Sequence, residues 1–246
     1  MHLALAAPDK EEVRAVWTYR WTELQALGVP VRLGVVATED MIRQFAPDLG
    51  VGATGSKPRP LALDLSGLAA DIRRAHAWDV LAEPAAIANG AAVAVIGGGM
   101  VGIEVADLLA LRGCRITIIE ALASIAPAMA RNNPTDILQR LQQAGVRILT
   151  RANLRSARGR DLVLETPEGT LNVAAGDAVI VAIGPKSERG GVPLLERAGA
   201  DYALVGDAQE PGDFLGAIRD GWLVGLSLET RFKQSASGGR VEVNPR

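Results

Sequence analysis

The sequence predicts an α/β fold built on a parallel sheet, because candidate strands and helices alternate over residues 92–149. The candidate strands are short, apolar and rich in β-branched residues, and the segments between them have helical periodicity. A β-α-β-α-β run of this kind favours parallel strands joined by right-handed crossovers. The expected order is strand Ala92–Ile96, helix Met100–Arg112, strand Arg115–Ile119, helix Thr135–Ala144 and strand Val146–Leu149.

Shorter elements are expected on both sides of this run. Before it we expect helix Lys10–Leu27 and strand Val31–Val36, then a short apolar run over Leu49–Ala53 with a turn-rich exit. A connector follows over residues 61–90, with a short helix at Ala77–Leu81. After it we expect a small antiparallel pair of strands, Leu162–Glu165 and Thr170–Val173. Two further strands, Ala178–Ile183 and Tyr202–Val205, then a helix, Phe214–Leu228, and a disordered tail over 231–246 are expected to follow.

Composition limits the classes of function. Lys and Arg total 26 against 28 Asp and Glu, so no overall field favours nucleic acid or an anionic membrane. Cys114 is the only cysteine, which excludes an internal disulfide and a CxxC redox pair, and neither histidine has a partner at metal-ligand spacing. No stretch approaches the roughly 20 apolar residues that span a bilayer. We expect a cytoplasmic protein without a metal site, whose ligand is a small molecule or another protein.

A G-x-G-x-x-G pattern occurs twice, and only the second occurrence has the context of a phosphate site. The first, at Gly50, Gly52 and Gly55, precedes a segment with two prolines, which is a poor start for a helix. The second follows a β-branched strand, opens a helix, and is followed at the end of the next strand by an acidic residue, Glu120. This is the Rossmann-type arrangement that binds a dinucleotide.

The second pattern predicts how the ADP half of a dinucleotide is held. The first glycine allows a sharp turn, the second lets the backbone approach the pyrophosphate, and the third lets helix and strand pack closely. The helix N-terminus then offers free amides to the phosphates. The residues expected to bind the cofactor here are Gly97, Gly98, Gly99, Met100, Val101, Gly102 and Glu120.

Glu120 also predicts which nucleotide is bound. Its carboxylate should accept hydrogen bonds from the adenosine ribose and repel a 2′-phosphate, so NAD(H) or ADP is favoured over NADP(H). Three arginines could weaken this preference, namely Arg112, Arg115 and Arg131. Glu104, near the start of the helix, could position a nicotinamide or simply complement the helix dipole. The alternative for the whole pattern is a βαβ unit that binds nothing and keeps its glycines for packing.

Four stretches together resemble a known family: Ala53–Pro58, Val93–Glu104, Ala182–Pro185 and Val205–Ala208. They are similar to the two-dinucleotide-binding flavoproteins of the pyridine nucleotide-disulfide oxidoreductase superfamily. The likeness is greatest to the C-terminal FAD/NAD(P) region of the 2,4-dienoyl-CoA reductase and trimethylamine dehydrogenase group. It extends over about residues 10 to 230.

The resemblance implies a Rossmann-type parallel sheet, an NAD(P) domain, inserted in a partial FAD-binding domain. Residues 1–60 and 185–230 would form the partial FAD-binding domain, 61–90 a connector, and 91–184 the NAD(H)- or ADP-binding domain. Asp207 would hydrogen-bond FAD, with Thr54 and Gly55 close to the flavin nucleotide. The further residues implied at the cofactors are Gly184, Gly206 and Ala208. The alternatives are an ordinary turn at Gly206-Asp207 and an interdomain hinge at Thr54-Gly55.

The sequence departs from the family in lacking the first FAD-binding glycine-rich unit, which would clamp the FAD pyrophosphate. The barrel that carries FMN and an iron-sulfur cluster in the nearest relatives is also absent, and no catalytic residue is identified. Our leading hypothesis is a subunit or fragment of a flavin-dependent oxidoreductase, with its FAD site completed by a partner flavoprotein subunit. The rivals are a structural or regulatory ADP-binding module without turnover, and a stand-alone NAD-dependent dehydrogenase, for which no Tyr-x-x-x-Lys pair is found.

Overall fold

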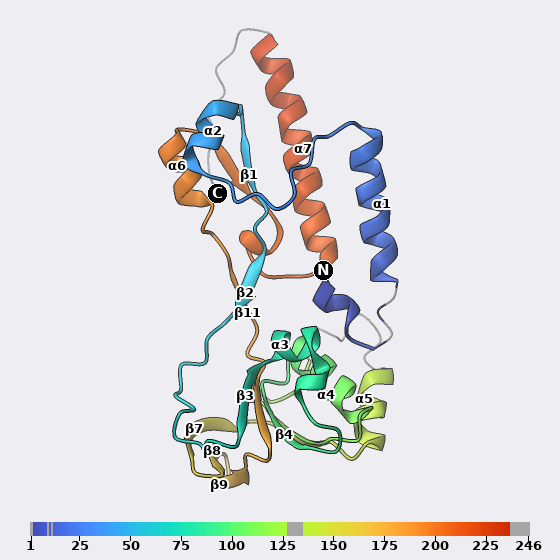
Figure 1. Ribbon diagram of the computed structural model, residues 1–246, viewed down its shortest axis with the longest axis vertical. Helices are drawn as coiled ribbons and strands as arrows, with labels where there is room; N and C mark the ends of the chain where they lie inside the picture. Colours follow the sequence, from blue (N-terminus) through green and yellow to red (C-terminus); the bar gives the residue numbers. More distant parts are fainter. Residues whose placement is uncertain (1, 9, 11, 127–134, 237–246) are drawn as a thin grey trace. The chain divides into compact units, whose positions relative to one another are not determined.

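The computed structural model divides the chain into two compact units, each described separately below (Figure 1). The residues described are 2–8, 10, 12–126 and 135–236. The first unit combines residues 1–31 with 58–184, and the second combines 32–57 with 185–246. Residues 1–31, expected in the partial FAD-binding domain, therefore group with the first unit.

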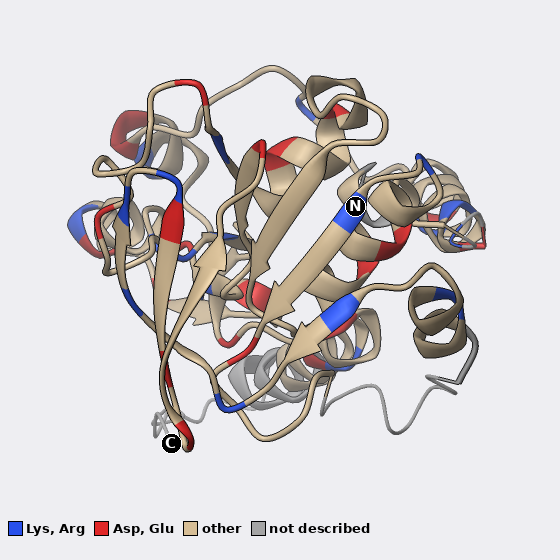
Figure 2. Ribbon diagram, turned by 90° about the horizontal axis from the view of Figure 1, so that it is seen from below, with Lys and Arg blue, Asp and Glu red and all other residues tan. Residues whose placement is uncertain are grey.

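The first unit is built on five parallel strands in the order β3-β10-β4-β5-β6. This order confirms the predicted Rossmann-type α/β fold. All four residues of β10 are buried, as expected for an apolar strand inside a parallel sheet. In Figure 2 the strands of this sheet carry little charge away from their ends. The strands are β3 (Arg73–His76), β4 (Ala92–Ile96), β5 (Arg115–Ile119), β6 (Arg147–Leu149) and β10 (Ala178–Val181).

Two hydrophobic cores form on opposite faces of this sheet. On one face the helices cover residues such as Val95 and Ile118 with Ile103 and Leu141. On the other face a three-stranded antiparallel sheet covers Ile96 and Val179 with Leu162 and Leu164. The covering elements are α3 (Ala77–Ala82), α4 (Met100–Ala110), α5 (Thr135–Gln143), β7 (Asn153–Arg158), β8 (Asp161–Thr166) and β9 (Gly169–Ala174).

The N-terminal residues of the first unit form two further helices, and a short 3-10 helix follows α3. They are η1 (His2–Leu5), α1 (Val13–Ala26) and η2 (Pro84–Ala86). Helix η1 contacts α3, whereas none of the residues of α1 is buried. Trp17 and Trp21 stack on α1 with their ring centroids 6.0 Å apart.

The second unit contains two sheets of two strands each. In one of them β1 and β12 pair in parallel, with Gly50 opposite Tyr202. The other joins β2 to β11, and α2 packs on α6. The elements are α2 (Glu39–Phe45), β1 (Gly50–Gly52), β2 (Ser56–Pro58), β11 (Pro185–Ser187), α6 (Val192–Ala198), β12 (Tyr202–Leu204), η4 (Gly206–Ala208) and α7 (Phe214–Ala236).

Two sequence predictions fail at the ends of the second unit. Residues 31–36 were expected to form a strand, but they are exposed and form no strand, because the described part of the chain places no neighbouring strand beside them. Helix α7 continues to Ala236, so the expected disordered tail does not begin at residue 231. The rest of that tail, 237–246, lies outside the described residues. No helix among the residues that the structure covers is long and apolar enough to cross a membrane.

An ion pair between a buried carboxylate, Asp107, and a partly exposed arginine, Arg140, joins α4 to α5. The Asp107 side chain is 1% exposed. Its Oδ1 accepts a hydrogen bond from Nε of Arg140 at 3.0 Å, and its Oδ2 accepts one from Nη2 of Arg140 at 2.6 Å. The bidentate geometry offsets the cost of removing the carboxylate from water.

Arg140→Ala should therefore lower the free energy of unfolding by about 2–4 kcal/mol, because it leaves a buried carboxylate without its partner. Arg155→Ala is the matched control, since the ion pair of Arg155 with Glu165 is exposed and should contribute less than about 1 kcal/mol. Denaturant unfolding of the two variants measures the difference. Equal losses of stability would contradict a structural role for the buried pair.

Candidate functional site

The predicted glycine turn lies at the carboxyl edge of the parallel sheet, between β4 and α4. Gly97 has φ +107°, and a Cβ placed there would lie 2.4 Å from the carbonyl oxygen of Ala182. Its amide donates to the carbonyl of Ile119 at 2.8 Å. Both the backbone conformation and the close approach of the segment after β10 therefore require glycine at this position.

The other glycines of the pattern have different surroundings. At Gly102 a Cβ would lie 2.0 Å from the carbonyl oxygen of Gly97, so this glycine lets α4 pack directly against the turn. At Gly99 a Cβ would meet no atom within 4 Å, although this residue is the N-cap of α4. Gly99 has no side chain to cap the helix, and the first turn of α4 holds no acidic residue. Space beside uncapped helix amides suits an anion.

Glu120 lies directly after β5 and fixes the turn. Its side chain is buried, with 9% of the residue exposed. One carboxylate oxygen accepts from the amide of Gly98 at 2.6 Å, and the other accepts from the amide of Leu122 at 2.7 Å. A carboxylate has about four acceptor sites, so further hydrogen bonds from a ligand hydroxyl remain chemically available. The sequence predicted the place of Glu120 but not its hydrogen bond to the turn.

Glu104 has a partner that the sequence did not suggest. Its carboxylate lies 3.2 Å from Nζ of Lys10, and its side chain is 12% exposed. The ion pair joins α4 to the N-terminal segment of the same unit. Met100 and Val101, the other predicted residues of the pattern, form the first turn of α4 and are partly exposed.

In the second unit, the residues implied by the family resemblance come together around one carboxylate. Asp207 accepts from the Ser56 hydroxyl at 2.7 Å through one oxygen, and from the amide of Gly212 at 3.0 Å through the other. The Thr54 hydroxyl donates to the carbonyl of Glu188, whose amide donates to the carbonyl of Gly55 at 2.9 Å. Two motifs about 150 residues apart in the chain therefore meet in one hydrogen-bonded cluster.

Gly206 directly precedes Asp207, the central carboxylate of this cluster. It has φ +56°, and its amide donates to Asp220 of α7 at 3.1 Å. Ala208 is fully buried beside it. Gly184, with φ +90°, belongs to the first unit, where its carbonyl accepts from the amide of Arg59 at 3.0 Å.

An ion pair lies next to the Thr54 contact. Nζ of Lys57 is 2.5 Å from Oε2 of Glu188, and Oε1 accepts from the amide of Gly190 at 2.8 Å. The hydrogen bond from Lys57, followed by that from the Gly190 amide, lowers the pKa of Glu188 below its usual value. Sequence reasoning missed Ser56, Glu188 and Asp220, because their roles depend on pairings between distant segments that no local pattern shows.

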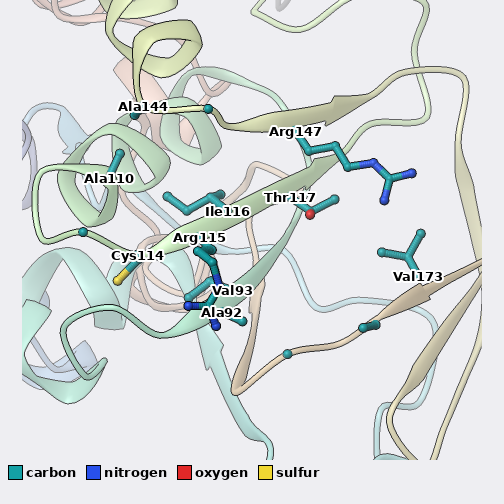
Figure 3. A pocket seen from close by; sticks show the side chains of 14 residues that line it. Ala92, Val93, Ala110, Cys114, Arg115, Ile116, Thr117, Ala144, Arg147 and Val173 are labelled. Atoms are coloured by element: carbon teal, nitrogen blue, oxygen red, sulfur yellow. The ribbon is translucent and has the colours of Figure 1, made fainter.

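A cavity lies at the opposite edge of the parallel sheet, away from the glycine turn. It has a volume of about 530 Å³ and is lined by residues at the starts of β4, β5 and β6, including Ala92, Arg115 and Arg147 (Figure 3). Cys114 also lines it and is buried. Within the described ranges no group of three His, Cys, Asp or Glu side chains could hold a metal ion.

Known proteins resemble the chain in sequence and in fold. A family profile described as pyridine nucleotide-disulphide oxidoreductase matches residues 23–203. An NADH oxidase of Thermoanaerobacter brockii is 32% identical over 232 residues, and a bilirubin reductase of Mediterraneibacter gnavus (strain CC55_001C) is 29% identical over 224 residues. The alignments cover 93% and 91% of this chain but only 35% and 34% of those proteins, so the chain spans about a third of their length.

Solved structures show the same fold. A 2-naphthoyl-CoA reductase superposes with a TM-score of 0.75 at 22% identity, covering 90% of this chain and 33% of that one. A 6-hydroxypseudooxynicotine amine oxidase from Pseudomonas geniculata N1 gives a TM-score of 0.74 at 23% identity, covering 89% and 35%.

Gly99→Val should abolish dinucleotide binding without unfolding the chain, because the added side chain enters open space where a pyrophosphate would approach. Gly102→Ala is the contrasting variant, since its Cβ would overlap the Gly97 carbonyl and should cost about 1–3 kcal/mol of stability. Titration with ADP and thermal unfolding of both variants separate the two effects. Unchanged ADP affinity in Gly99→Val would show that the turn is not the binding site.

Proposed function

The chain belongs to the pyridine nucleotide-disulphide oxidoreductase family, and on that premise we propose that it is a component of a flavin-dependent oxidoreductase. In this proposal the first unit binds NAD(H) or ADP at the glycine turn, and the second unit contributes part of an FAD site. The family implies FAD and NAD(P) binding, and these cofactors would supply the hydride and electron transfer.

One observation carries the assignment of the first unit. Protein contacts hold the glycine turn in shape: the Glu120 carboxylate accepts from the amide of Gly98, and the amide of Ala126 donates to the carbonyl of Gly98 at 2.7 Å. The space beside Gly99 and the uncapped N-terminus of α4 would suit a phosphate group. A preformed site of this kind loses little conformational entropy when its ligand binds.

The position of Glu120 supports NAD(H) or ADP over NADP(H). Its buried carboxylate lies at the end of β5, where the ribose of the ADP half would lie, and a 2′-phosphate would meet a negative charge there. Arg112 and Arg115, which the sequence suggested as possible counter-charges, are at the other end of β5: Arg112 donates to the carbonyl of Ile87, and Arg115 begins the strand. Arg131 lies outside the described residues.

The second unit supports a shared FAD site. Ser56 and the amide of Gly212 hold the Asp207 carboxylate in one orientation, which fits a residue that accepts a hydrogen bond from a ribityl hydroxyl. Yet among the described residues β1 and β12 form a parallel sheet of two strands, whereas parallel sheets are normally larger and covered on both faces. We propose that a partner chain supplies the missing glycine-rich strand-turn-helix unit.

The exposed face of α7 supports a partner for the same unit. Leu215, Ile218, Trp222 and Leu226 recur at helical spacing along α7, and between 38% and 75% of each is exposed. An apolar stripe of this size on a helix favours association. The chain spans about a third of the length of these relatives.

A second candidate is an ADP-binding module without turnover. Glu104, the residue that could position a nicotinamide, is already paired with Lys10, and the predicted residues of the glycine pattern would bind the ADP half. Equal affinities for ADP and NADH would favour this candidate, whereas tighter binding of NADH would favour a site that also holds the nicotinamide.

Glu120→Ala should reduce the affinity for NADH about tenfold or more, because it removes charge-assisted hydrogen bonds to the ribose and to Gly98. It should also reduce the preference for NADH over NADPH, because the repulsion of the 2′-phosphate disappears. Fluorescence titration of both nucleotides measures the ratio. A variant with an unchanged ratio would contradict the role assigned to Glu120.

The chain purified alone should contain little flavin and should tend to associate, because the FAD pyrophosphate lacks its glycine-rich clamp and the apolar stripe of α7 is uncovered. Together with a chain that carries the missing unit, it should form a yellow complex that transfers electrons from NADH to flavin. Absorbance at flavin wavelengths and size-exclusion chromatography measure both properties. A monomer with stoichiometric FAD would refute the shared site.

A further inference from the structure

We infer that Arg151 is a second determinant of nucleotide choice, placed to interact with a group at the 2′ position of the adenosine ribose. This inference rests on the proposed NAD(H) or ADP site and adds one residue to it. The sequence pattern did not identify Arg151, because the residue follows β6 rather than the glycine turn or the strand that ends at Glu120.

Backbone hydrogen bonds place Arg151 beside Glu120. The amide of Glu120 donates to the carbonyl of Leu149 at 2.8 Å, and the amide of Ala152 donates to the carbonyl of Glu120 at 2.9 Å. Between these two contacts, the amide of Arg151 donates to the carbonyl of Leu122 at 2.8 Å. Arg151 therefore lies against the segment that follows Glu120, at the same carboxyl edge of the sheet as the glycine turn.

The backbone of Arg151 is unusual for an arginine. It has φ +50°, in the left-handed region that glycine and asparagine favour. Such a conformation costs of order 1 kcal/mol for a residue with a Cβ, and positions of this kind often occur where a side chain serves a site. The Arg151 side chain is exposed, and none of the described residues forms an ion pair or hydrogen bond with its guanidinium.

The chemistry of the two side chains is complementary. Glu120 accepts hydrogen bonds from a free ribose hydroxyl and repels a phosphate there, whereas a guanidinium attracts phosphate through several aligned donors. Arg151 would therefore offset part of the repulsion from Glu120. The site should still prefer NADH, since Glu120 is the buried charge, but by a smaller factor than Glu120 alone would impose.

The test compares NADH with NADPH, which differ only in the 2′-phosphate, in calorimetric titrations of the full chain and of Arg151→Gly. Glycine removes the guanidinium and suits the observed φ, so the variant should be at least as stable in thermal unfolding. We expect its affinity for NADPH to fall about tenfold, while that for NADH changes less than about twofold.

Arg147→Ala is the matched control. Arg147 is exposed and begins the same strand, β6, at the opposite edge of the sheet, so this variant has the same change in net charge far from the glycine turn (Figure 3). It should leave the ratio of the two affinities unchanged. If Arg151→Gly and Arg147→Ala give the same ratio while the unmodified chain binds ADP, the inference about Arg151 is overturned and the proposed function stands. If the unmodified chain binds no ADP, both are overturned.

Discussion

The first unit depends on the hydrogen bond between the Glu120 carboxylate and the amide of Gly98. This contact joins the end of β5 to the turn after β4, and so fixes where α4 begins. Together with the hydrogen bond from the amide of Ala126 to the carbonyl of Gly98, it holds the start of α4 beside the open space at Gly99. The same carboxylate also accepts from Leu122, so a single buried charge shapes both the turn and the segment that follows β5.

The position of this contact follows from the sheet. Five parallel strands place all their carboxyl ends at one edge, and the order β3-β10-β4-β5-β6 puts Gly97 beside the segment after β10 and Glu120 beside the segment after β6. Two cores hold the sheet, one under α3, α4 and α5 and one under β7, β8 and β9. The residues proposed to face the ligand therefore lie on loops, and the two hydrophobic cores that hold those loops in place lie on the faces of the sheet.

Sequence reasoning identified the parts of the fold that have local signals. The strands β4 and β5, and the glycine turn with Glu120, carry β-branched runs or fixed spacing, and the structure contains them. Strand β3 was missed because it begins with Arg73 and Arg74 at a sheet edge, and the expected strand over 31–36 is absent because β-propensity without a partner strand does not form a sheet. Ser56 and Arg151 became visible only through contacts between distant segments.

We propose above all that the first unit holds the ADP half of a dinucleotide at the glycine turn. The most direct measurement incubates the purified chain with NADH, NADPH, ADP and FAD together, removes free ligand, and identifies the nucleotide released on denaturation. If the glycine turn binds the ADP half, NAD(H) or ADP should be released at about one per chain. Release of flavin alone, or of no nucleotide, would contradict it.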